Sequence, residues 1–281
     1  MRNSRPDQAV LITGASSGIG LQTALHLHER GYRVWATARQ PADLDRLTHA
    51  GIRALPLDMR DSEQIRSVAA EVLSATDNRL WGLFNNAGYG QPGAVEDLSR
   101  DALREQFESN FFGAVELTNA LLPAMRAAGE GRIIQNSSVL GFAAMPYRGA
   151  YNASKFALEG ITDTLRLELQ GSGIEVSLIE PGPIRTRFRE NALAAFQRHI
   201  DVSNSAHREA YERVLARLEA RANNNRFALD PQAVTDCVVH ALESPRPKIR
   251  YRVTTPTKTF AVLKRLLPAR VLDRLLGSVR E

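Results

Sequence analysis

The chain has 281 residues, which suits one α/β domain and leaves little room for a second. Hydrophobic residues make up 43 % and charged residues 24 %, which excludes global disorder. A single cysteine, Cys237, excludes an intramolecular disulfide, and no Cys/His cluster has metal-ligand spacing, so we expect a reducing compartment and no metal. Of the formal net charge of +5, residues 246–281 carry +8, which leaves −3 for the remainder.

Short β-branched segments alternate with longer amphipathic ones from the N-terminus onward. The pattern predicts strands at residues 9–15, 32–38, 52–58, 80–86, 132–138 and 175–181. It predicts helices at 19–31, 61–75, 100–129 and 154–173. This alternation implies βαβ crossovers, and the apolar first strands imply helices on both faces. We therefore predict an α/β protein: a three-layer Rossmann fold with a doubly wound parallel sheet in a single domain.

The segment 187–229 breaks the alternation and is too long for a plain connection. Its Ala, Arg and Glu content predicts one or two helices, and an insertion after a strand's carboxyl end lies over the ligand crevice of such a sheet. We expect one domain over 1–281, with a cofactor-binding and catalytic core at 8–186, a substrate lid at 187–229 and a basic extension at 246–281.

No targeting segment is visible at the N-terminus, where the first apolar run, 9–15, is too short for a signal peptide. No uncharged apolar run approaches the roughly 20 residues that span a bilayer. We therefore expect a cytoplasmic protein.

A glycine-rich turn, T-G-A-S-S-G-I-G at 13–20, joins the first predicted strand to the first helix. Gly14, Gly18 and Gly20 let the chain turn tightly and let a pyrophosphate approach the backbone. The helix N-terminus then supplies free amides and a partial positive charge. The alternative is a tight loop without a ligand, but the position between first strand and first helix favours dinucleotide binding.

The end of the second predicted strand selects between NAD and NADP. An NAD site would carry an acidic residue there, whereas this strand ends at Ala38 and Arg39 follows. An arginine offers the 2′-phosphate of NADP a charged partner, so we predict NADP(H) in preference to NAD(H). The alternative is that Arg39 is a surface residue that contacts nothing. Asp58 is expected either to bond the adenine amine or to serve as a helix cap or turn residue.

Tyr151 and Lys155 are four residues apart in Y-N-A-S-K and share one face of a predicted helix. A neighbouring ammonium stabilises a phenolate and lowers its pKa from ~10 toward neutrality. Such a pair is often only a surface pair, but its context is specific. Ser138 ends a predicted strand thirteen residues earlier, and Asn110 lies in the middle of a predicted helix.

These motifs resemble the short-chain dehydrogenase/reductase superfamily in its single-domain form. The resemblance rests on T-G-A-S-S-G-I-G, N-N-A-G at 85–88, S-S at 137–138, Y-N-A-S-K at 151–155 and P-G-P-I-R-T at 181–186, which stand in the family's order and spacing over about residues 8–190. Residues 148–160 and 264–276 are similar to a bacterial subgroup regarded as NADP-dependent aldehyde reductases. Hydroxysteroid and retinol dehydrogenases resemble the chain more distantly.

The resemblance implies catalytic roles for four residues. Tyr151 would be the general acid in reduction and the base in oxidation, and Lys155 would bind the nicotinamide ribose and lower the Tyr151 pKa. Ser138 would hydrogen-bond the substrate oxygen. Asn110 would hold a water of a proton relay. The spacing to Tyr151 selects Ser138 over Ser137, which would point to the opposite side of the strand.

The resemblance also implies the cofactor contacts. The pyrophosphate and adenosine would be lined by Gly14, Ser16, Ser17, Gly18, Ile19 and Gly20. Arg39, Asp58, Met59, Asn86, Ala87 and Gly88 would border the adenosine half. Pro181, Gly182, Ile184 and Thr186 would contact the nicotinamide half, together with Tyr151 and Lys155.

The substrate pocket should be apolar and formed after Gly88, after Ser138 and within 187–229. Besides Ser138 and Tyr151, we expect Leu140, Tyr147 and Phe188 to contact the substrate. Further apolar candidates are Tyr89, Phe142, Met145 and Phe196. These side chains indicate a hydrophobic aldehyde or ketone, unless they merely pack the lid against the sheet.

The C-terminal stretch 260–276 is basic and amphipathic, and Pro268 divides it. It is expected to touch a membrane surface peripherally, to cover the substrate pocket or to pack between subunits. Nucleic-acid binding is not expected, because the body of the chain is mildly acidic and no recognition motif occurs. Two other functions remain as alternatives: a catalytically idle dinucleotide sensor and a peripheral membrane protein. The resemblance implies a homodimer or homotetramer.

Overall fold

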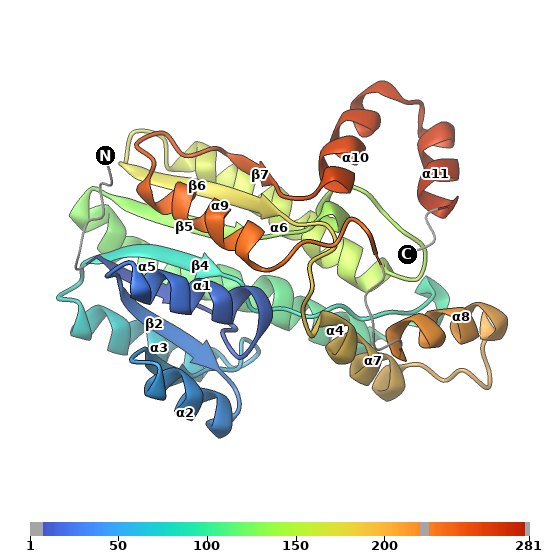
Figure 1. Cartoon of the computed structure of the whole chain (residues 1–281), viewed down its shortest axis with the longest axis horizontal. Helices are drawn as coiled ribbons and strands as arrows, with labels where there is room; N and C mark the ends of the chain where they lie inside the picture. The colour runs from blue at the N-terminus through green and yellow to red at the C-terminus, as the bar shows by residue number, and fades with distance from the viewer. Residues whose placement is uncertain (1–7, 220–224, 279–281) are drawn as a thin grey trace.

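The computed structural model describes residues 8–219 and 225–278 and has a single parallel sheet of seven strands (Figure 1). The strand order is β3-β2-β1-β4-β5-β6-β7. The strands are β1 (Ala9–Ile12), β2 (Arg33–Ala38), β3 (Arg53–Pro56), β4 (Leu80–Asn85), β5 (Gly131–Asn136), β6 (Ile174–Glu180) and β7 (Arg250–Arg252). The predicted doubly wound α/β fold is confirmed.

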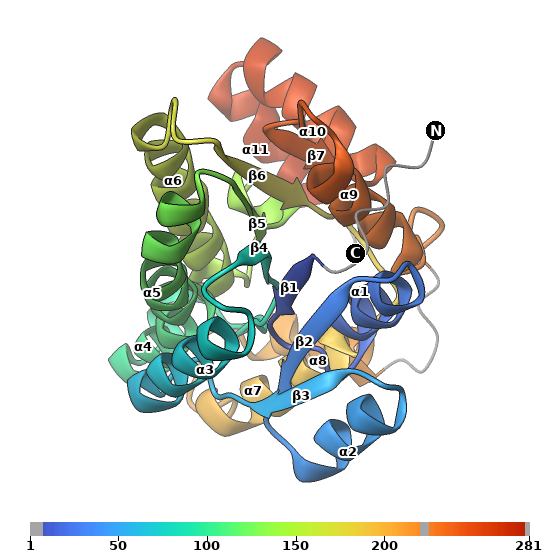
Figure 2. The same ribbon diagram turned by 90° about the vertical axis from the view of Figure 1, so that its left-hand side faces the viewer.

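Helices cover both faces of the sheet, as Figure 2 shows. Those of the core are α1 (Gly18–Glu29), α2 (Pro41–His49), α3 (Ser62–Ala75), α4 (Arg100–Phe107), α5 (Gly113–Ala128), α6 (Gly149–Glu168) and α9 (Gln232–Glu243). The outlying helices are α7 (Phe188–His199), α8 (Arg208–Glu219), α10 (Thr255–Leu266) and α11 (Ala269–Ser278). Three short turns complete the chain: 3-10 turns η1 (Val95–Asp97) and η3 (Val139–Gly141), and a π-helical turn η2 (Glu108–Phe112).

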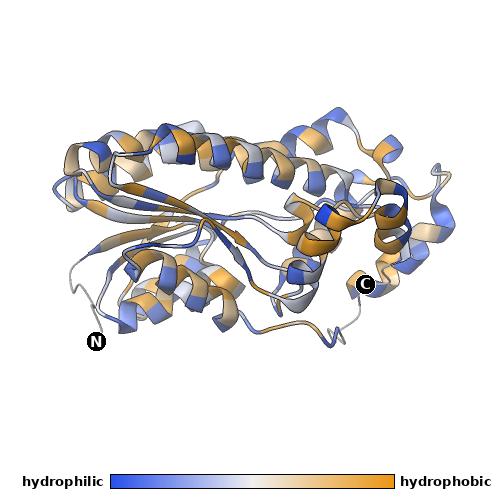
Figure 3. Cartoon of the chain, turned by 90° about the horizontal axis from the view of Figure 1, so that it is seen from above, coloured by the Kyte–Doolittle hydropathy of each residue, from blue (hydrophilic) through white to orange (hydrophobic). Residues whose placement is uncertain are grey.

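The alternation of side chains along β1 divides the core into two layers. Leu11 packs with α3 and α5 on one face, and Val10 and Ile12 pack with α1 and α9 on the other. Each of these side chains is completely buried, and such burial stabilises by about 1.5–3 kcal/mol per side chain. Figure 3 shows apolar stretches along the strands of the sheet, interrupted by hydrophilic residues.

The predicted elements differ from the structure mainly at short segments and at ends. Helices α2 and α9 and strand β7 were not predicted, and the predicted helix 100–129 is a continuous run of α4, η2 and α5. The prediction that Ser138 ends a strand is wrong, because β5 stops at Asn136 and Ser138 precedes η3. Asp58 likewise lies two residues beyond β3.

The strand order reverses direction between β1 and β4, which places a crevice at the carboxyl ends of these strands. The two predicted helices of the 187–229 segment are α7 and α8, and they lie beyond that edge of the sheet (Figure 1). Residues 220–224 of this segment and 279–281 of the basic extension lie outside the described residues. None of the helices described is long and apolar enough to cross a membrane.

Candidate active site

The glycine-rich turn follows β1 at the point where the strand order reverses between β1 and β4. Gly14 has a left-handed φ of +67°, and a Cβ there would lie 2.7 Å from the Cα of Ala87. Gly18 has a φ of +55°, and a Cβ there would lie 2.8 Å from Cγ2 of Thr186. Side chains at both positions are therefore excluded by backbone conformation and by contact. The turn brings the segments around Ala87 and Thr186 together, as predicted for one cofactor site.

Helix α1 presents uncapped amides to this turn. The Ser17 backbone is extended and its hydroxyl makes no capping hydrogen bond. The first backbone bond of the helix runs from Leu21 N to Ser17 O at 3.3 Å, so the amides of residues 18–20 precede it. The first turn of α1 contains no acidic residue. This arrangement can bind an anion through backbone N–H groups and the helix dipole.

Asn86 holds the glycine turn in place. Its Nδ2 donates to the carbonyls of Thr13 and Gly14 at 3.0 Å each, and its Oδ1 accepts from Nδ2 of Asn136 at 2.9 Å. The fully buried Thr13 hydroxyl accepts from the amides of Asn86 and Ala87, both at 3.0 Å. Thr13 was not predicted as a site residue, although it stands first in the glycine motif.

Basic side chains gather at the adenosine end of the crevice. Arg39 is exposed directly after β2, as predicted. Arg46, on the unpredicted helix α2, donates to the carbonyl of Ser16 and pairs with Asp43 at 2.9 Å. The available sequence signal was Pro41, because proline is favoured at the first position of a helix. Arg46 lies on the helix that starts there.

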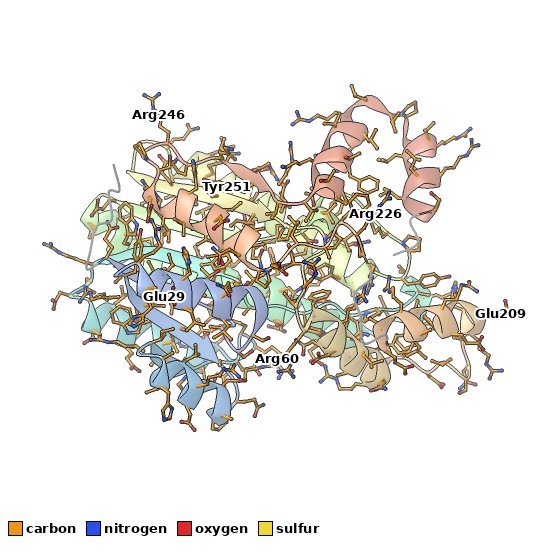
Figure 4. All side chains as sticks on the ribbon, viewed as in Figure 1. Glu29, Arg60, Glu209, Arg226, Arg246 and Tyr251 are labelled. Atoms are coloured by element: carbon orange, nitrogen blue, oxygen red, sulfur yellow. The ribbon has the colours of Figure 1, made fainter. Side chains whose placement is uncertain are left out.

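Asp58 is engaged within the protein. Arg60 binds both of its carboxylate oxygens, with Nη2 to Oδ2 at 2.7 Å and Nε to Oδ1 at 3.0 Å. The Arg60 guanidinium therefore holds the pKa of Asp58 below its usual value, despite partial burial. Asp58 does not cap α3, because Asp61 accepts from the amides of Glu63 and Gln64. Arg60, labelled in Figure 4, also pairs with Glu105, which in turn pairs with Arg198 of α7.

Met59 and Ile19, both predicted to contact the adenosine half of the cofactor, pack against the hydrophobic core. The Met59 side chain is buried in the core beneath α5, and a Cβ on Gly113 would lie 2.1 Å from its carbonyl oxygen. Ile19 is half-buried against the core on the other face of the sheet.

Lys155 is buried beside Tyr151 on helix α6. Its Nζ donates to the carbonyl of Asn136 at 2.7 Å and lies 5.8 Å from the centre of the Tyr151 ring. Burial lowers the pKa of Lys155 to about 8, and the nearby Glu159 carboxylate opposes that change. An ammonium in this position is poorly solvated, so its field acts strongly on the adjacent phenol.

Asn110 connects the catalytic helix to the loop that follows β4. It sits in η2, where Gly113 N bonds Glu108 O five residues back. The Asn110 side chain accepts from Tyr89 N at 3.0 Å and donates to Tyr89 O at 2.9 Å. It also donates to Ser154 Oγ at 3.3 Å. The side-chain amide thus fixes the protein framework around Tyr151.

Ser137 and Ser138 both follow the end of β5, and their side chains have different surroundings. Ser138 Oγ accepts from the amide of Leu140 at 3.1 Å, beside the cluster that contains Tyr151. A Cβ on Gly141 would lie 2.5 Å from Ser137 Oγ and 3.0 Å from Glu159 Oε1, so Ser137 faces the carboxylate. The two serines are distinguished by these contacts and not by the faces of a strand.

The loop after β6 lies between the glycine turn and the C-terminal segment. The Pro181 carbonyl accepts from Val139 N at 2.8 Å, and a Cβ on Gly182 would lie 2.1 Å from Thr254 Oγ1. Ile184 pairs with Leu229 in an isolated parallel bridge, which ties the end of the lid segment to this loop. The residues predicted for the nicotinamide side thus contact three different segments: η3, the start of α10 and residue 229.

Apolar side chains cover Tyr151. Phe188, at the start of α7, packs edge-to-face on the Tyr151 ring with centroids 5.4 Å apart. Leu140 joins the same cluster, as do Leu272 and Leu276 of α11. The last two were missed, although their four-residue spacing in the amphipathic tail was the available signal.

Tyr147 turns toward the lid instead of toward Tyr151. Its ring packs against His207 and Tyr211, at centroid distances of 5.6 and 6.0 Å. It also has a left-handed φ of +59°. Its position matches the alternative that such residues pack the lid against the core.

Gly88 lies beside Asn110, because a Cβ on Gly88 would lie 3.0 Å from Asn110 Oδ1.

The topology and the anion-binding turn define a Rossmann-type protein with a dinucleotide crevice at the β1–β4 switch point. A family described as short chain dehydrogenase matches residues 8–196. The uncharacterized oxidoreductase YbbO of Escherichia coli K12 is 48 % identical over 96 % of this chain and 94 % of its own. Human 17-beta-hydroxysteroid dehydrogenase type 1 is 35 % identical over 87 % of this chain and 77 % of its own.

Two solved structures extend the comparison. A short-chain dehydrogenase from Streptomyces avermitilis has a TM-score of 0.78 at 32 % identity and covers 95 % of this chain and 96 % of its own. A single-residue variant of actinorhodin polyketide ketoreductase, solved with NADPH, has a TM-score of 0.70 at 29 % identity, over 90 % of this chain and 97 % of its own. The chain belongs to the short-chain dehydrogenase/reductase family and is an oxidoreductase of that family.

Proposed function

We propose that this protein interconverts an apolar carbonyl compound and its alcohol by hydride transfer with NADP(H). The observation that carries the proposal is the buried ammonium of Lys155, 5.8 Å from the ring of Tyr151 at the crevice. A phenol next to a desolvated cation is a better proton donor and acceptor near neutral pH than a free tyrosine.

The residues around the crevice fit a dinucleotide. Glycines at 14 and 18 leave a backbone cradle that a Cβ would fill, and the α1 amides of residues 18–20 face it. Arg39 and Arg46 provide cations at its adenosine end, where an acidic residue would repel a 2′-phosphate. These features support NADP over NAD. When bound, the nicotinamide supplies or accepts the hydride.

The chain's own residues would handle the proton and the substrate oxygen. In reduction, Tyr151 Oη donates a proton to the carbonyl oxygen while Ser138 Oγ hydrogen-bonds the same oxygen. Lys155 holds the positive charge that stabilises the resulting phenolate. In our proposal Asn110 contributes by fixing Tyr89 and Ser154 around the site. A relay water held by Asn110 would form its hydrogen bond in addition to these two contacts.

An apolar substrate is favoured by the groups that cover Tyr151. Leu140, Phe188, Leu272 and Leu276 offer hydrocarbon surface to the part of the substrate beyond its carbonyl. A hydroxysteroid dehydrogenase among the relatives supports the same class. Phe188 packs directly on the tyrosine ring and the α11 leucines belong to the same cluster, so we expect them to move apart when the substrate enters.

The test is the Tyr151→Phe variant, compared with Tyr32→Phe, whose hydroxyl bonds Glu243 far from the crevice. We expect Tyr151→Phe to lose about 10²–10⁴-fold in kcat for NADPH-dependent reduction of aliphatic and aromatic aldehydes and ketones. NADPH affinity should stay within about threefold in both variants. Equal turnover by Tyr151→Phe would refute the role, and NADPH binding without turnover of any carbonyl by the natural chain would indicate a dinucleotide sensor.

The same assay tests the cofactor preference. Replacing Arg39 and Arg46 by Ala should weaken NADPH binding by about tenfold or more and leave NADH binding nearly unchanged. Arg79→Ala, a change of an exposed arginine before β4, is the matched control. An unchanged ratio of the two affinities would count against NADP.

A further inference from the structure

Helices α10 and α11 form a hairpin that projects from the body of the protein. Figures 1 and 2 show it rising from one side of the molecule, with the connection between the helices at its far end. Its base is anchored: Thr254 caps α10 beside Gly182, and Leu276 of α11 is buried in the cluster of Tyr151. The inner face of the hairpin is therefore part of the folded core, and the outer face is not.

The outer face carries apolar side chains that stay exposed within the described residues 8–219 and 225–278. Val262 and Leu266 are 53 % and 73 % exposed and lie four residues apart on α10. Val271 and Leu275 are each 40 % exposed and are spaced in the same way on α11. Each pair forms a short stripe along its helix. Leu266 stands at the far end of the hairpin, next to the Leu267–Pro268 connection.

Cations flank these stripes. Residues 255–278 contain five Lys and Arg and one acidic residue, Asp273. Arg265, Arg270 and Arg274 are exposed, and within the described part of the chain none of them has a carboxylate at ion-pair distance. Two of these arginines, Arg265 and Arg270, bracket the connection itself. Exposed arginines beside exposed leucines and valines fit a partner that has an anionic surface over an apolar interior.

We propose that the α10–α11 hairpin docks this protein on the surface of an anionic phospholipid bilayer. The leucine and valine stripes enter the interface, and the arginines meet the lipid phosphates. Charge complementarity favours this occupant. A second copy of the same face would bring two groups of like charge together, and an acidic protein surface would leave the apolar stripes without a matching hydrocarbon phase.

Docking in this way would bring the catalytic edge of the sheet near the bilayer, because the same hairpin covers Tyr151 at its base. An apolar substrate could then pass between membrane and crevice. This consequence rests on the proposed function, whereas docking itself does not. Vesicle binding by the Tyr151→Phe variant should therefore equal that of the natural chain, whatever its activity.

The experiment is vesicle cosedimentation of the full chain. One set of vesicles is phosphatidylcholine alone, and the other contains about 30 % phosphatidylglycerol, both at about 0.05 M salt. We expect binding to the anionic vesicles at least about tenfold tighter than to the neutral ones, and loss of that difference at about 0.5 M salt. No binding to the anionic vesicles at low salt would overturn the proposal.

Two matched pairs of variants locate the surface. Reversing the charge of Arg265 and Arg270 to Glu should weaken anionic-vesicle binding by about tenfold or more, and reversing the exposed Arg79 and Arg100 should have a much smaller effect. Leu266→Ser should weaken binding severalfold, whereas Val95→Ser, at a residue that is 74 % exposed in η1, should leave it unchanged. Equal effects within either pair would contradict the assignment to the hairpin.

Folding and self-association are monitored on the same samples. All variants should keep the melting temperature of the natural chain within a few degrees, because the replaced side chains are exposed. Light scattering without lipid should give the same mass for the natural chain and the hairpin variants. A lower mass for the hairpin variants would assign the surface to a second copy of the chain and overturn the proposal.

Discussion

At the scale of single residues, a network of buried and half-buried charges lies behind Lys155, the lysine of the proposed mechanism. Glu159, one helical turn after Lys155, contacts Arg250 of β7. Arg250 also binds the fully buried Glu180 at 2.6 Å and Asp163 at 2.5 Å. Arg250 thus contacts three carboxylates at the end of the sheet, and Glu180 and Asp163 each pair with a second arginine, Arg252 and Arg166. Removing one charge from such a buried ion-pair network lowers the stability of the fold, because the remaining charges lose their partner.

The Glu159→Gln variant should change the pH dependence of the enzyme. In the proposed mechanism Lys155 acts on Tyr151 as an ammonium, so its pKa of about 8 predicts that activity falls as the pH rises above that value. The Glu159 carboxylate raises this pKa, so its neutralisation should lower it and move the alkaline decline of kcat/KM toward acid by about half to one pH unit. Steady-state kinetics from pH 6 to about 10 would measure it.

Glu168→Gln is the control for this change, since Glu168 is the exposed last residue of the same helix. Its pH profile should coincide with that of the natural chain. If Glu159→Gln reduced kcat equally at every pH, the carboxylate would act on the fold alone, and the electrostatic role would be wrong.

At the scale of elements, the C-terminal segment is joined to the core where α10 begins. Gly182 follows β6 in close contact with the buried Thr254 and Thr257, which a Cβ would approach to 2.1 and 2.8 Å. This contact fixes the start of α10 against the loop that follows β6. The hairpin therefore keeps its position over the site only while this junction stays tightly packed.

The Gly182→Ala variant should lower the free energy of unfolding by about 1–3 kcal/mol, because the added methyl group displaces the Thr254 cap. Urea denaturation followed by circular dichroism would measure the change as a lower midpoint.

Gly160→Ala is the matched control. Gly160 is an exposed position inside α6, where a Cβ would meet no atom within 4 Å. Alanine there should raise stability by about 0.5–1 kcal/mol through helix propensity. If Gly182→Ala raised stability as Gly160→Ala does, the packing at Gly182 would not be tight in solution.

At the scale of the whole molecule, apolar residues remain exposed along α6 and η2, besides those of the hairpin. Phe156, Ile161 and Phe112 are each at least 39 % exposed. Phe156 and Ile161 lie on the helix that carries Tyr151, and Phe112 lies on the π-helical turn that carries Asn110. We propose that this side is a subunit interface of a homodimer or homotetramer, since exposed apolar patches commonly mark such surfaces.

Ile161→Asp should then reduce the mass measured by multi-angle light scattering to that of a smaller oligomer or a monomer, because a buried unpaired carboxylate is costly. Val95→Asp, at the more exposed position in η1, should leave the mass unchanged. A natural chain that is monomeric at micromolar concentration would remove the basis of this prediction.

The sequence alone sufficed for the features that depend on local pattern. The alternation of strands and helices predicted the sheet, and the glycine turn placed the anion-binding helix end, because both are set by backbone conformation near in sequence. Tyr151 and Lys155 share a helix face by their spacing. The family resemblance added Ser138 and Asn110, which the structure places around the same crevice.

Tertiary structure decided what depends on distant contacts. Helix α2 and strand β7 were missed because they are short, and their contributions, Arg46 at the glycine turn and Arg250 behind Lys155, depend on packing. The end of β5 before Ser138 was misplaced because neighbouring strands set where pairing stops. The tail could be recognised as amphipathic from sequence, but only the fold determined that Leu276 faces Tyr151 and Leu266 faces solvent, because burial is a property of the assembled layers.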